Sequence, residues 1–156
     1  MRNSGSKKCR IKLRRCYDTD VKVDYWTGSH TKHRLLYHFV FIPKYRKRVL
    51  SSKVQQRIIE LFTECCQANG WMIAQLEMMS DHVHLLIQLT TTDSPAKAMK
   101  YLKGGSSRVI REEFPHLKAF LWGKNFWARG YFVESIGSKD EFTLKKYLNQ
   151  QSDRHS

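Results

Sequence analysis

Long apolar segments are missing from this sequence. The longest apolar runs, 35–43 and 83–89, are far shorter than the roughly 20 residues that cross a bilayer. The basic N-terminus is not followed by the apolar segment that makes a secretory signal. We therefore expect no membrane span, no membrane partner and a cytoplasmic location.

Acidic residues are also scarce. Asp and Glu total 14 against 28 Lys and Arg, which gives a formal net charge of +14 and a pI of about 9.8. An excess of this size is typical of nucleic-acid-binding proteins. An anionic membrane surface is the weaker option, because no strongly amphipathic basic helix stands out. The sequence thus favours a polyanionic partner.

The cysteines are few and do not pair along the sequence. Cys65 and Cys66 are adjacent within a helical pattern, where they cannot easily bond to each other, and the other two lie in a polar segment. Reduced thiols fit best. A zinc site can be drawn from four residues, Cys9, Cys16, His30 and His33. Nothing else supports that site, because the sequence has no C-x-x-C pair.

The chain has the length of one domain, preceded by a basic arm. Residues 1–34 hold 10 Lys and Arg against 3 Asp and show hardly any apolar periodicity. We predict that 1–34 forms an N-terminal arm that contacts nucleic acid or only raises solubility. Residues 35–156 then form the folded domain.

Apolar periodicity and turn residues predict the order strand, helix, strand, strand, helix, strand. The predicted strands cover 35–42, 71–79, 82–89 and 126–136, and the predicted helices cover 51–69 and 94–114. The second helix is expected to loosen at Gly104 and Gly105. A capping box at Ser138 predicts one more helix, which contains Tyr147.

This order predicts an α+β protein with the ferredoxin-like or RRM-like split βαβ fold. Four antiparallel strands then carry two helices on one face, and the C-terminal helix carries Tyr147. Apolar residues at helical spacing define the buried side of the first helix: Val54, Ile58, Leu61, Phe62 and Cys65.

Two histidines open the predicted third core strand. Successive side chains of a strand point to opposite faces, so His82 and His84 share one face while Val83 and its alternate neighbours face the helices. That spacing can present two imidazoles to one metal ion, and Asp81 can hold one ring by a hydrogen bond. A histidine pair on a polar face can also serve only solubility.

A second pair lies near the C-terminus. Tyr147 and Gln151 are four residues apart in a helical pattern, so they share one helix face. They could bring a phenol and an amide oxygen to the metal held by the histidines. Their alternatives are a tyrosine that covers a seam between helix and sheet and an exposed amide.

These residues and two further motifs resemble those of a known protein family. Together with the segments 37–46 and 105–108, His82, His84, Tyr147 and Gln151 resemble the single-tyrosine HUH transposases of small prokaryotic insertion sequences. The resemblance runs from about residue 35 to 151. It implies that His82, His84 and Gln151 bind the catalytic metal and that Tyr147 is the nucleophile.

The resemblance also implies a reaction and partners. The substrate would be single-stranded DNA with hairpins at the ends of the element, cleaved through a 5′-phosphotyrosine link. The protein would work as a homodimer, with active sites that can be exchanged between subunits through a hinge at Gly137. A tyrosine hydroxyl, with a pKa of about 10, is a poor nucleophile at neutral pH. Mg²⁺ or Mn²⁺ would assist as a Lewis acid.

Two basic clusters are candidate DNA contacts. The first interleaves an aromatic ring with cations: Lys44, Tyr45, Arg46, Lys47 and Arg48. The second surrounds the glycine pair: Lys100, Lys103, Arg108 and Arg111. Cations can neutralise phosphates and exposed rings can stack on unpaired bases. A solvated basic face is the alternative.

Three other functions remain possible from the sequence. A replication initiator or relaxase-like nuclease would use the same chemistry. A domesticated relative would act on dispersed chromosomal repeats. A non-enzymatic RRM-like RNA-binding module would stack bases on the sheet and would need neither His82 nor Tyr147.

Overall fold

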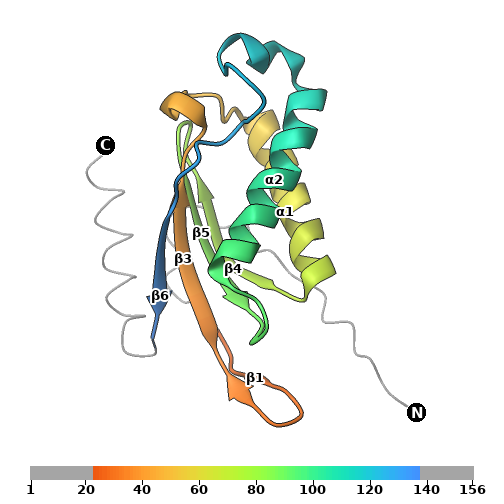
Figure 1. Cartoon of the computed structure of the whole chain (residues 1–156), viewed down its shortest axis with the longest axis vertical. Coiled ribbons are helices and arrows are strands. Elements are labelled where there is room, and N and C mark those ends of the chain that lie inside the picture. Colours follow the sequence, from red (N-terminus) through yellow and green to blue (C-terminus); the bar gives the residue numbers. More distant parts are fainter. Residues whose placement is uncertain (1–22, 138–156) are drawn as a thin grey trace.

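The computed structural model describes residues 23–137 of the chain (Figure 1). Tyr147, Gln151 and the predicted helix that carries them lie outside these residues. The strands are β1 (Trp26–Thr27), β2 (Lys32–His33), β3 (Leu35–Phe41), β4 (Met72–Met78), β5 (Val83–Leu89) and β6 (Phe132–Ile136). The helices are η1 (Lys44–Arg46), α1 (Ser52–Asn69), α2 (Pro95–Glu113) and η2 (Pro115–Ala119).

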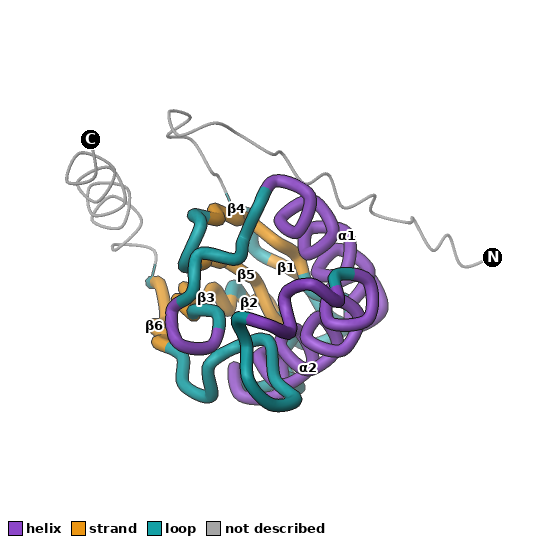
Figure 2. The backbone as a smooth tube through the Cα atoms, turned by 90° about the horizontal axis from the view of Figure 1, so that it is seen from above, coloured by secondary structure: helices purple, strands orange, loops and turns teal. Residues whose placement is uncertain are grey.

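The four long strands form one antiparallel sheet in the order β4-β5-β3-β6. β3 is central and pairs with β5 on one side and β6 on the other, while β4 pairs with the far side of β5. Figure 2 shows α1 and α2 as a layer on one face of this sheet. The predicted α+β fold with two helices on one face is confirmed.

The face of β5 beneath the helices is entirely apolar. Val83, Leu85, Ile87 and Leu89 have no exposed surface, as strand alternation predicts. The apolar side of α1 packs in the same core through Val54, Ile58, Phe62 and Cys66. The predicted Leu61 and Cys65 are partly buried and pack against this core, while Cys66, which the pattern did not include, is fully buried.

The two long helices begin and end where the sequence indicates. Gly70 follows α1 in the left-handed conformation, with φ at 72°, and its N–H bonds to the carbonyls of Cys66 and Gln67. The Ser94 hydroxyl accepts the N–H of Lys97 at the start of α2. These caps satisfy backbone groups that a helix end leaves without partners.

The predicted loosening of α2 at Gly104 and Gly105 is not found, because one regular helix continues through both glycines. Each glycine lowers helix propensity by about 1 kcal/mol relative to alanine. Leu102, Ser106 and Ile110 lie on the buried side of the same turns and anchor the helix to the core. Tertiary packing therefore outweighs the local preference.

The last strand is shorter than predicted, since β6 begins at Phe132 rather than at residue 126. Phe126 and Trp127 are nevertheless buried, in a segment that makes one isolated bridge from Trp127 to Pro43. The Trp127 indole donates a hydrogen bond to the Ser106 hydroxyl at 2.9 Å. This segment is held by side-chain packing against α2 and by two backbone hydrogen bonds, from Lys44 N–H to the Phe126 carbonyl at 2.9 Å and from Ala128 N–H to the Ile42 carbonyl at 3.0 Å.

The end of the predicted N-terminal arm is structured. β1 and β2 form a short antiparallel hairpin, and Val23 packs with Leu36, Leu86 and Ile136 on the sheet face opposite the helices. Residues 23–34 thus contain two short strands that the sequence patterns did not predict. Apolar periodicity missed them because two strands of two residues are too short to show a pattern.

The sheet face opposite the helices is only partly open. Leu86 and Gln88 are buried there, whereas His82 and His84 at the other end of β5 keep part of their surface exposed.

Within residues 23–137, neither long helix has the length and apolarity required for a transmembrane segment.

Candidate active site

His82 and His84 lie where β5 begins. His84 is the second residue of the strand and His82 directly precedes it. Their ring centroids are 5.2 Å apart and the ring planes are at 80°. The predicted pair therefore comes together at one end of the open face, at a separation at which both rings can reach one ion.

The His82 ring is held by Asp81. His82 Nδ1 lies 2.6 Å from Asp81 Oδ1, and Arg46 Nε donates to Asp81 Oδ2 at 3.1 Å. A carboxylate only accepts hydrogen bonds, so His82 Nδ1 carries a proton and Nε2 keeps the lone pair that a metal needs. Burial acts to raise the pKa of Asp81, but the hydrogen bond and charge of His82, with the Arg46 charge, leave that pKa below its usual value.

The His84 ring is held by a third histidine, His38 of β3. His38 Nε2 lies 3.1 Å from His84 Nδ1, and the ring planes differ by only 10°. The ring centroids are 5.3 Å apart, much farther than the two nitrogens. The rings therefore meet edge to edge and do not lie face to face. His38 is only 3% exposed.

Sequence reasoning missed His38 as part of the site. It appeared only as one residue of a buried strand within the segment 37–46. The contact depends on the pairing of Val40 with His84, which places His38 diagonally across from His84. The one available signal was a histidine within a run of apolar residues, because a buried polar side chain needs a partner.

Both buried histidines favour the neutral form. Burial, together with the neighbouring His38 and His82, lowers the pKa of His84 to about 4. Burial also lowers the pKa of His38, against the opposing charge of Glu134. Neutral imidazole is the form that binds metal ions.

The donor set present fits a divalent ion but is incomplete within the described part of the chain. His82 and His84 each contact a neighbour through Nδ1, so their Nε2 atoms are the ring nitrogens that could reach an ion. Residues 23–137 contain no group of three His, Cys, Asp or Glu side chains that could hold a metal. A third ligand must come from elsewhere, and the predicted Gln151 lies outside the described residues, as does Tyr147.

The alternative zinc site cannot be assembled from described residues. Cys9 and Cys16 lie outside them. His33 is placed against Trp26, with ring centroids 6.0 Å apart, and its Nδ1 is 3.4 Å from the Thr31 hydroxyl.

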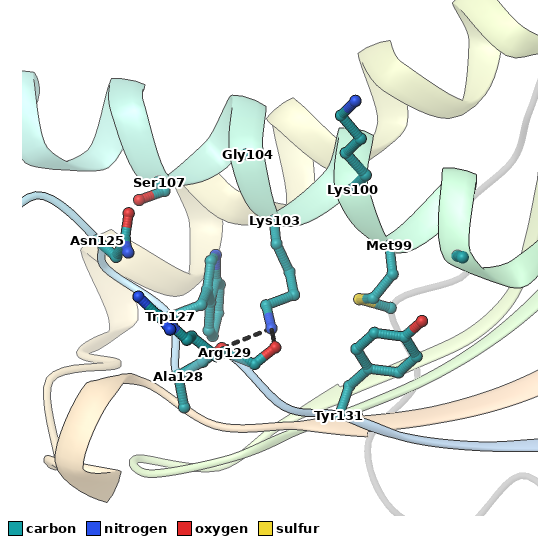
Figure 3. Close-up of a pocket in the computed structure, with 11 residues that line it drawn as sticks. Met99, Lys100, Lys103, Gly104, Ser107, Asn125, Trp127, Ala128, Arg129 and Tyr131 are labelled. Atoms are coloured by element: carbon teal, nitrogen blue, oxygen red, sulfur yellow. Dashed lines mark hydrogen bonds between the residues drawn. The ribbon is translucent and has the colours of Figure 1, made fainter.

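Lys103, one of the predicted DNA contacts, is turned toward the protein. Its ammonium donates to the carbonyls of Ala128, Arg129 and Gly130 at 2.5, 3.1 and 3.1 Å (Figure 3). It lines a pocket between α2 and the segment before β6, and burial lowers its pKa. Lys103 thus ties this segment to α2, and we no longer count it as a phosphate contact.

The cations of the η1 cluster are divided between internal and external positions. Lys44 donates to the Trp122 carbonyl and lies 5.2 Å from the centre of the Tyr45 ring. Arg46 is bound to Asp81 as described above. Of the remaining predicted cations, Arg111 on α2 is half-buried and the others are exposed: Lys47 and Arg48 near η1, and Lys100 and Arg108 on α2.

Two exposed aromatic rings lie beside these cations. Tyr45 is 60% exposed and Trp122 is 75% exposed, and Lys44 contacts both residues. Tyr45 and Arg46 both have positive φ, at 60° and 51°, a conformation that costs non-glycine residues about 1–2 kcal/mol. The Arg46–Asp81 ion pair helps to hold it. Trp122 lies in a connection between predicted elements, where no periodicity distinguishes it from the neighbouring aromatic residues Phe120, Phe126 and Trp127.

Comparison with known proteins places this chain in a family. The sequence profile described as Transposase IS200 like matches residues 31–151. The chain belongs to this family of IS200-like transposases. The predicted family and transposase function are confirmed, and the replication-initiator and RNA-binding alternatives are set aside.

Named relatives of this transposase agree with the family match. The transposase for insertion sequence element IS200 of Salmonella typhimurium is 32% identical over 123 residues, which is 79% of this chain and 80% of the relative. The ISDra2 transposase TnpA of Deinococcus radiodurans is 32% identical over 127 residues, 81% of this chain and 91% of the relative.

Solved structures agree as well. A crystal structure of a candidate transposase from Deinococcus radiodurans has a TM-score of 0.67 and 32% identity, and the match covers 81% of this chain and 97% of that one. A REP-associated tyrosine transposase bound to a REP hairpin has a TM-score of 0.59 at 14% identity, over 83% and 75% of the two chains. The second likeness concerns the fold alone.

The low pKa of His84 predicts how stability of the metal-free transposase depends on pH. Between the ordinary value of 6.5 and about 4, the unfolded chain takes up a proton on His84 that the folded chain does not. Stability should therefore fall as the pH drops through this window, and the effect should vanish above pH 6.5.

Urea unfolding at steps between about pH 7 and 5 measures this dependence. His84→Gln removes the titrating ring, so the variant should lose stability less steeply than the wild type as the pH falls. Equal slopes for the two proteins would contradict the assignment of a depressed pKa to His84.

Proposed function

We propose that this transposase cleaves and rejoins single-stranded DNA at the ends of an insertion sequence through a covalent tyrosine intermediate. The observation that supports the proposal most directly is the pair of imidazoles at the start of β5. Each is fixed through Nδ1, by Asp81 or by His38, so that both Nε2 atoms remain for one Mg²⁺ or Mn²⁺. Two imidazoles leave positions for substrate oxygens, as a catalytic metal site requires.

The roles of the chain's residues follow from this arrangement. His82, His84 and Gln151 hold the ion, which would polarise the scissile phosphate when bound. The Tyr147 oxygen attacks the phosphorus, the bond from phosphorus to the 3′-oxygen breaks, and the departing oxygen takes a proton to become a free 3′-hydroxyl. The phosphotyrosine ester keeps the bond energy, so a second 3′-hydroxyl can reverse the step and join a new end without ATP.

The surface around η1 is suited to single-stranded DNA. Lys47, Arg48 and Arg108 are exposed cations that can neutralise phosphates, and Tyr45 and Trp122 are exposed rings on which bases can stack. Arg46 bonds to Asp81, which bonds to His82, so η1 adjoins the metal ligands. A strand bound at η1 therefore runs next to the site of cleavage.

Hairpin recognition and a dimeric enzyme complete the proposal. One structural relative carries a bound REP hairpin, and the fold is shared. β6 ends at Ile136, and the predicted tyrosine helix follows after Gly137. We propose that this connection lets the helix complete the histidine site of either subunit in a homodimer.

A covalent adduct tests the reaction. The full-length protein is mixed with labelled single-stranded hairpin DNA from its element end and with Mg²⁺ or Mn²⁺, and the products are separated under denaturing conditions. The wild type should give a protein–DNA adduct that remains visible, because the phosphotyrosine bond survives denaturation. Chelation of the metal ion before the reaction should abolish this adduct. Tyr147→Phe should give none while it still binds the hairpin. An equal adduct from Tyr147→Phe would overturn the choice of nucleophile.

Base stacking on Trp122 gives a second prediction. Trp122→Ala should weaken binding of a single strand about 5- to 100-fold, because one stacked base contributes about 1–3 kcal/mol. Fluorescence anisotropy with a labelled oligonucleotide measures the dissociation constant. Tyr101→Ala is the matched control, since Tyr101 is 44% exposed on α2. The control should bind as the wild type does. If Trp122→Ala also binds as the wild type does, the strand does not cross this surface.

A further inference from the structure

The buried His38 is the feature of the open sheet face that the proposed reaction does not yet use. It lies in the middle of β3, directly opposite Leu86 on β5 and Glu134 on β6. Its side chain is 3% exposed. A buried polar side chain is unfavourable without a hydrogen-bond partner, so its contacts should reveal its purpose.

The partner of His38 is a metal-site histidine. His38 Nε2 lies 3.1 Å from His84 Nδ1, and the two rings meet edge to edge with their planes 10° apart. This nearly coplanar contact is the geometry of one N–H that points along the lone pair of the other ring. It fixes both the position of the His84 ring and its rotation.

The direction of this hydrogen bond decides which nitrogen of His84 can bind a metal. If His84 Nδ1 is the donor, His84 Nε2 keeps a lone pair; if it is the acceptor, Nε2 carries the proton and cannot be a ligand. Glu134, the direct cross-strand neighbour of His38, provides a negative charge on the same face. β6 lies on the side of β3 away from His84, so this charge favours a proton on Nδ1, the His38 nitrogen that does not meet His84, and leaves His38 Nε2 as the acceptor.

Asp81 and His38 then have equivalent positions. Asp81 accepts the Nδ1 proton of His82, and His38 accepts the Nδ1 proton of His84. A ligand histidine commonly donates its second nitrogen to an acceptor in this way, which fixes its tautomer and makes it a better ligand. At the buried position of His38 a neutral acceptor avoids the cost of a second buried carboxylate.

We propose that His38 is a positioning residue of the metal site, which accepts the Nδ1 proton of His84 and holds its Nε2 toward the ion. The inference rests on the proposed function, since it assigns His84 as a ligand. His38 is not itself a ligand, because its Nε2 is occupied by His84. The distinct feature is a pair of histidines from neighbouring strands, of which only one meets the metal.

The tautomer can be measured directly in the metal-free protein. Two-dimensional NMR of ¹⁵N-labelled histidine distinguishes a proton on Nδ1 from one on Nε2, and His84→Gln identifies the signals of His84. We expect His84 to carry its proton on Nδ1 and His38 to carry none on Nε2. A proton on His84 Nε2 would overturn the inference whatever the outcome of the adduct experiment.

Metal affinity tests the positioning role. Titration calorimetry with Mn²⁺ should show about 10- to 100-fold weaker binding for His38→Leu, the usual effect of losing the acceptor behind a ligand histidine. His38→Gln, which restores an acceptor oxygen, should recover most of the affinity, and the exposed His116→Leu should match the wild type. Unchanged affinity in His38→Leu would contradict the role. A variant that fails to fold leaves the NMR test of the wild type decisive.

Failure of this inference and failure of the proposed function give different results. If His84 carries its proton on Nε2 but the phosphotyrosine adduct forms normally, only the proposed role of His38 is wrong. If His84 has the expected tautomer but the protein forms no adduct, the proposed reaction is wrong.

Discussion

The register of β3 against β5 is the constraint on which the rest of the molecule depends. Val40 pairs with His84 and Phe41 with Val83, which places the apolar side of β5 under the helices and its histidine side on the opposite face. A slip of one residue would move the histidines into the core and the apolar side chains out of it. Burial of the apolar side chains of β5 in the core thus fixes the sheet face on which the histidines lie.

A network of polar contacts then connects the site to the surface around it. Arg46 binds Asp81, Asp81 binds His82, and His84 binds His38. The left-handed backbone of Tyr45 and Arg46 exposes the Tyr45 ring beside the same network. Strained residues of this kind persist only where their surroundings hold them, and they concentrate at functional sites. The loop that we assign to DNA and the histidines that we assign to metal are therefore held by one set of contacts.

Local sequence patterns predicted most of the fold because helix and strand periods are local properties. The alternation around Val83 placed the histidines correctly, and the adjacency of Asp81 predicted its contact with His82. Patterns failed where the partner is distant in the sequence. His38 and His84 are 46 residues apart and meet only through strand register.

The basic residues illustrate the same limit. Lys103 donates to the carbonyls of residues 128–130, and Lys44 donates to the carbonyl of Trp122. A count of charge cannot separate such internal cations from Lys47 and Arg48, which remain exposed. Only the fold shows which charges a DNA strand can reach.

The central claim is that one divalent ion binds the imidazoles of both His82 and His84. Pulsed electron paramagnetic resonance of the Mn²⁺-loaded protein measures it most directly, since nitrogen atoms bound to Mn²⁺ give characteristic couplings. The account predicts two bound imidazole nitrogens in the wild type and one in either His82→Gln or His84→Gln. A spectrum without nitrogen couplings, or one that neither substitution changes, would contradict it.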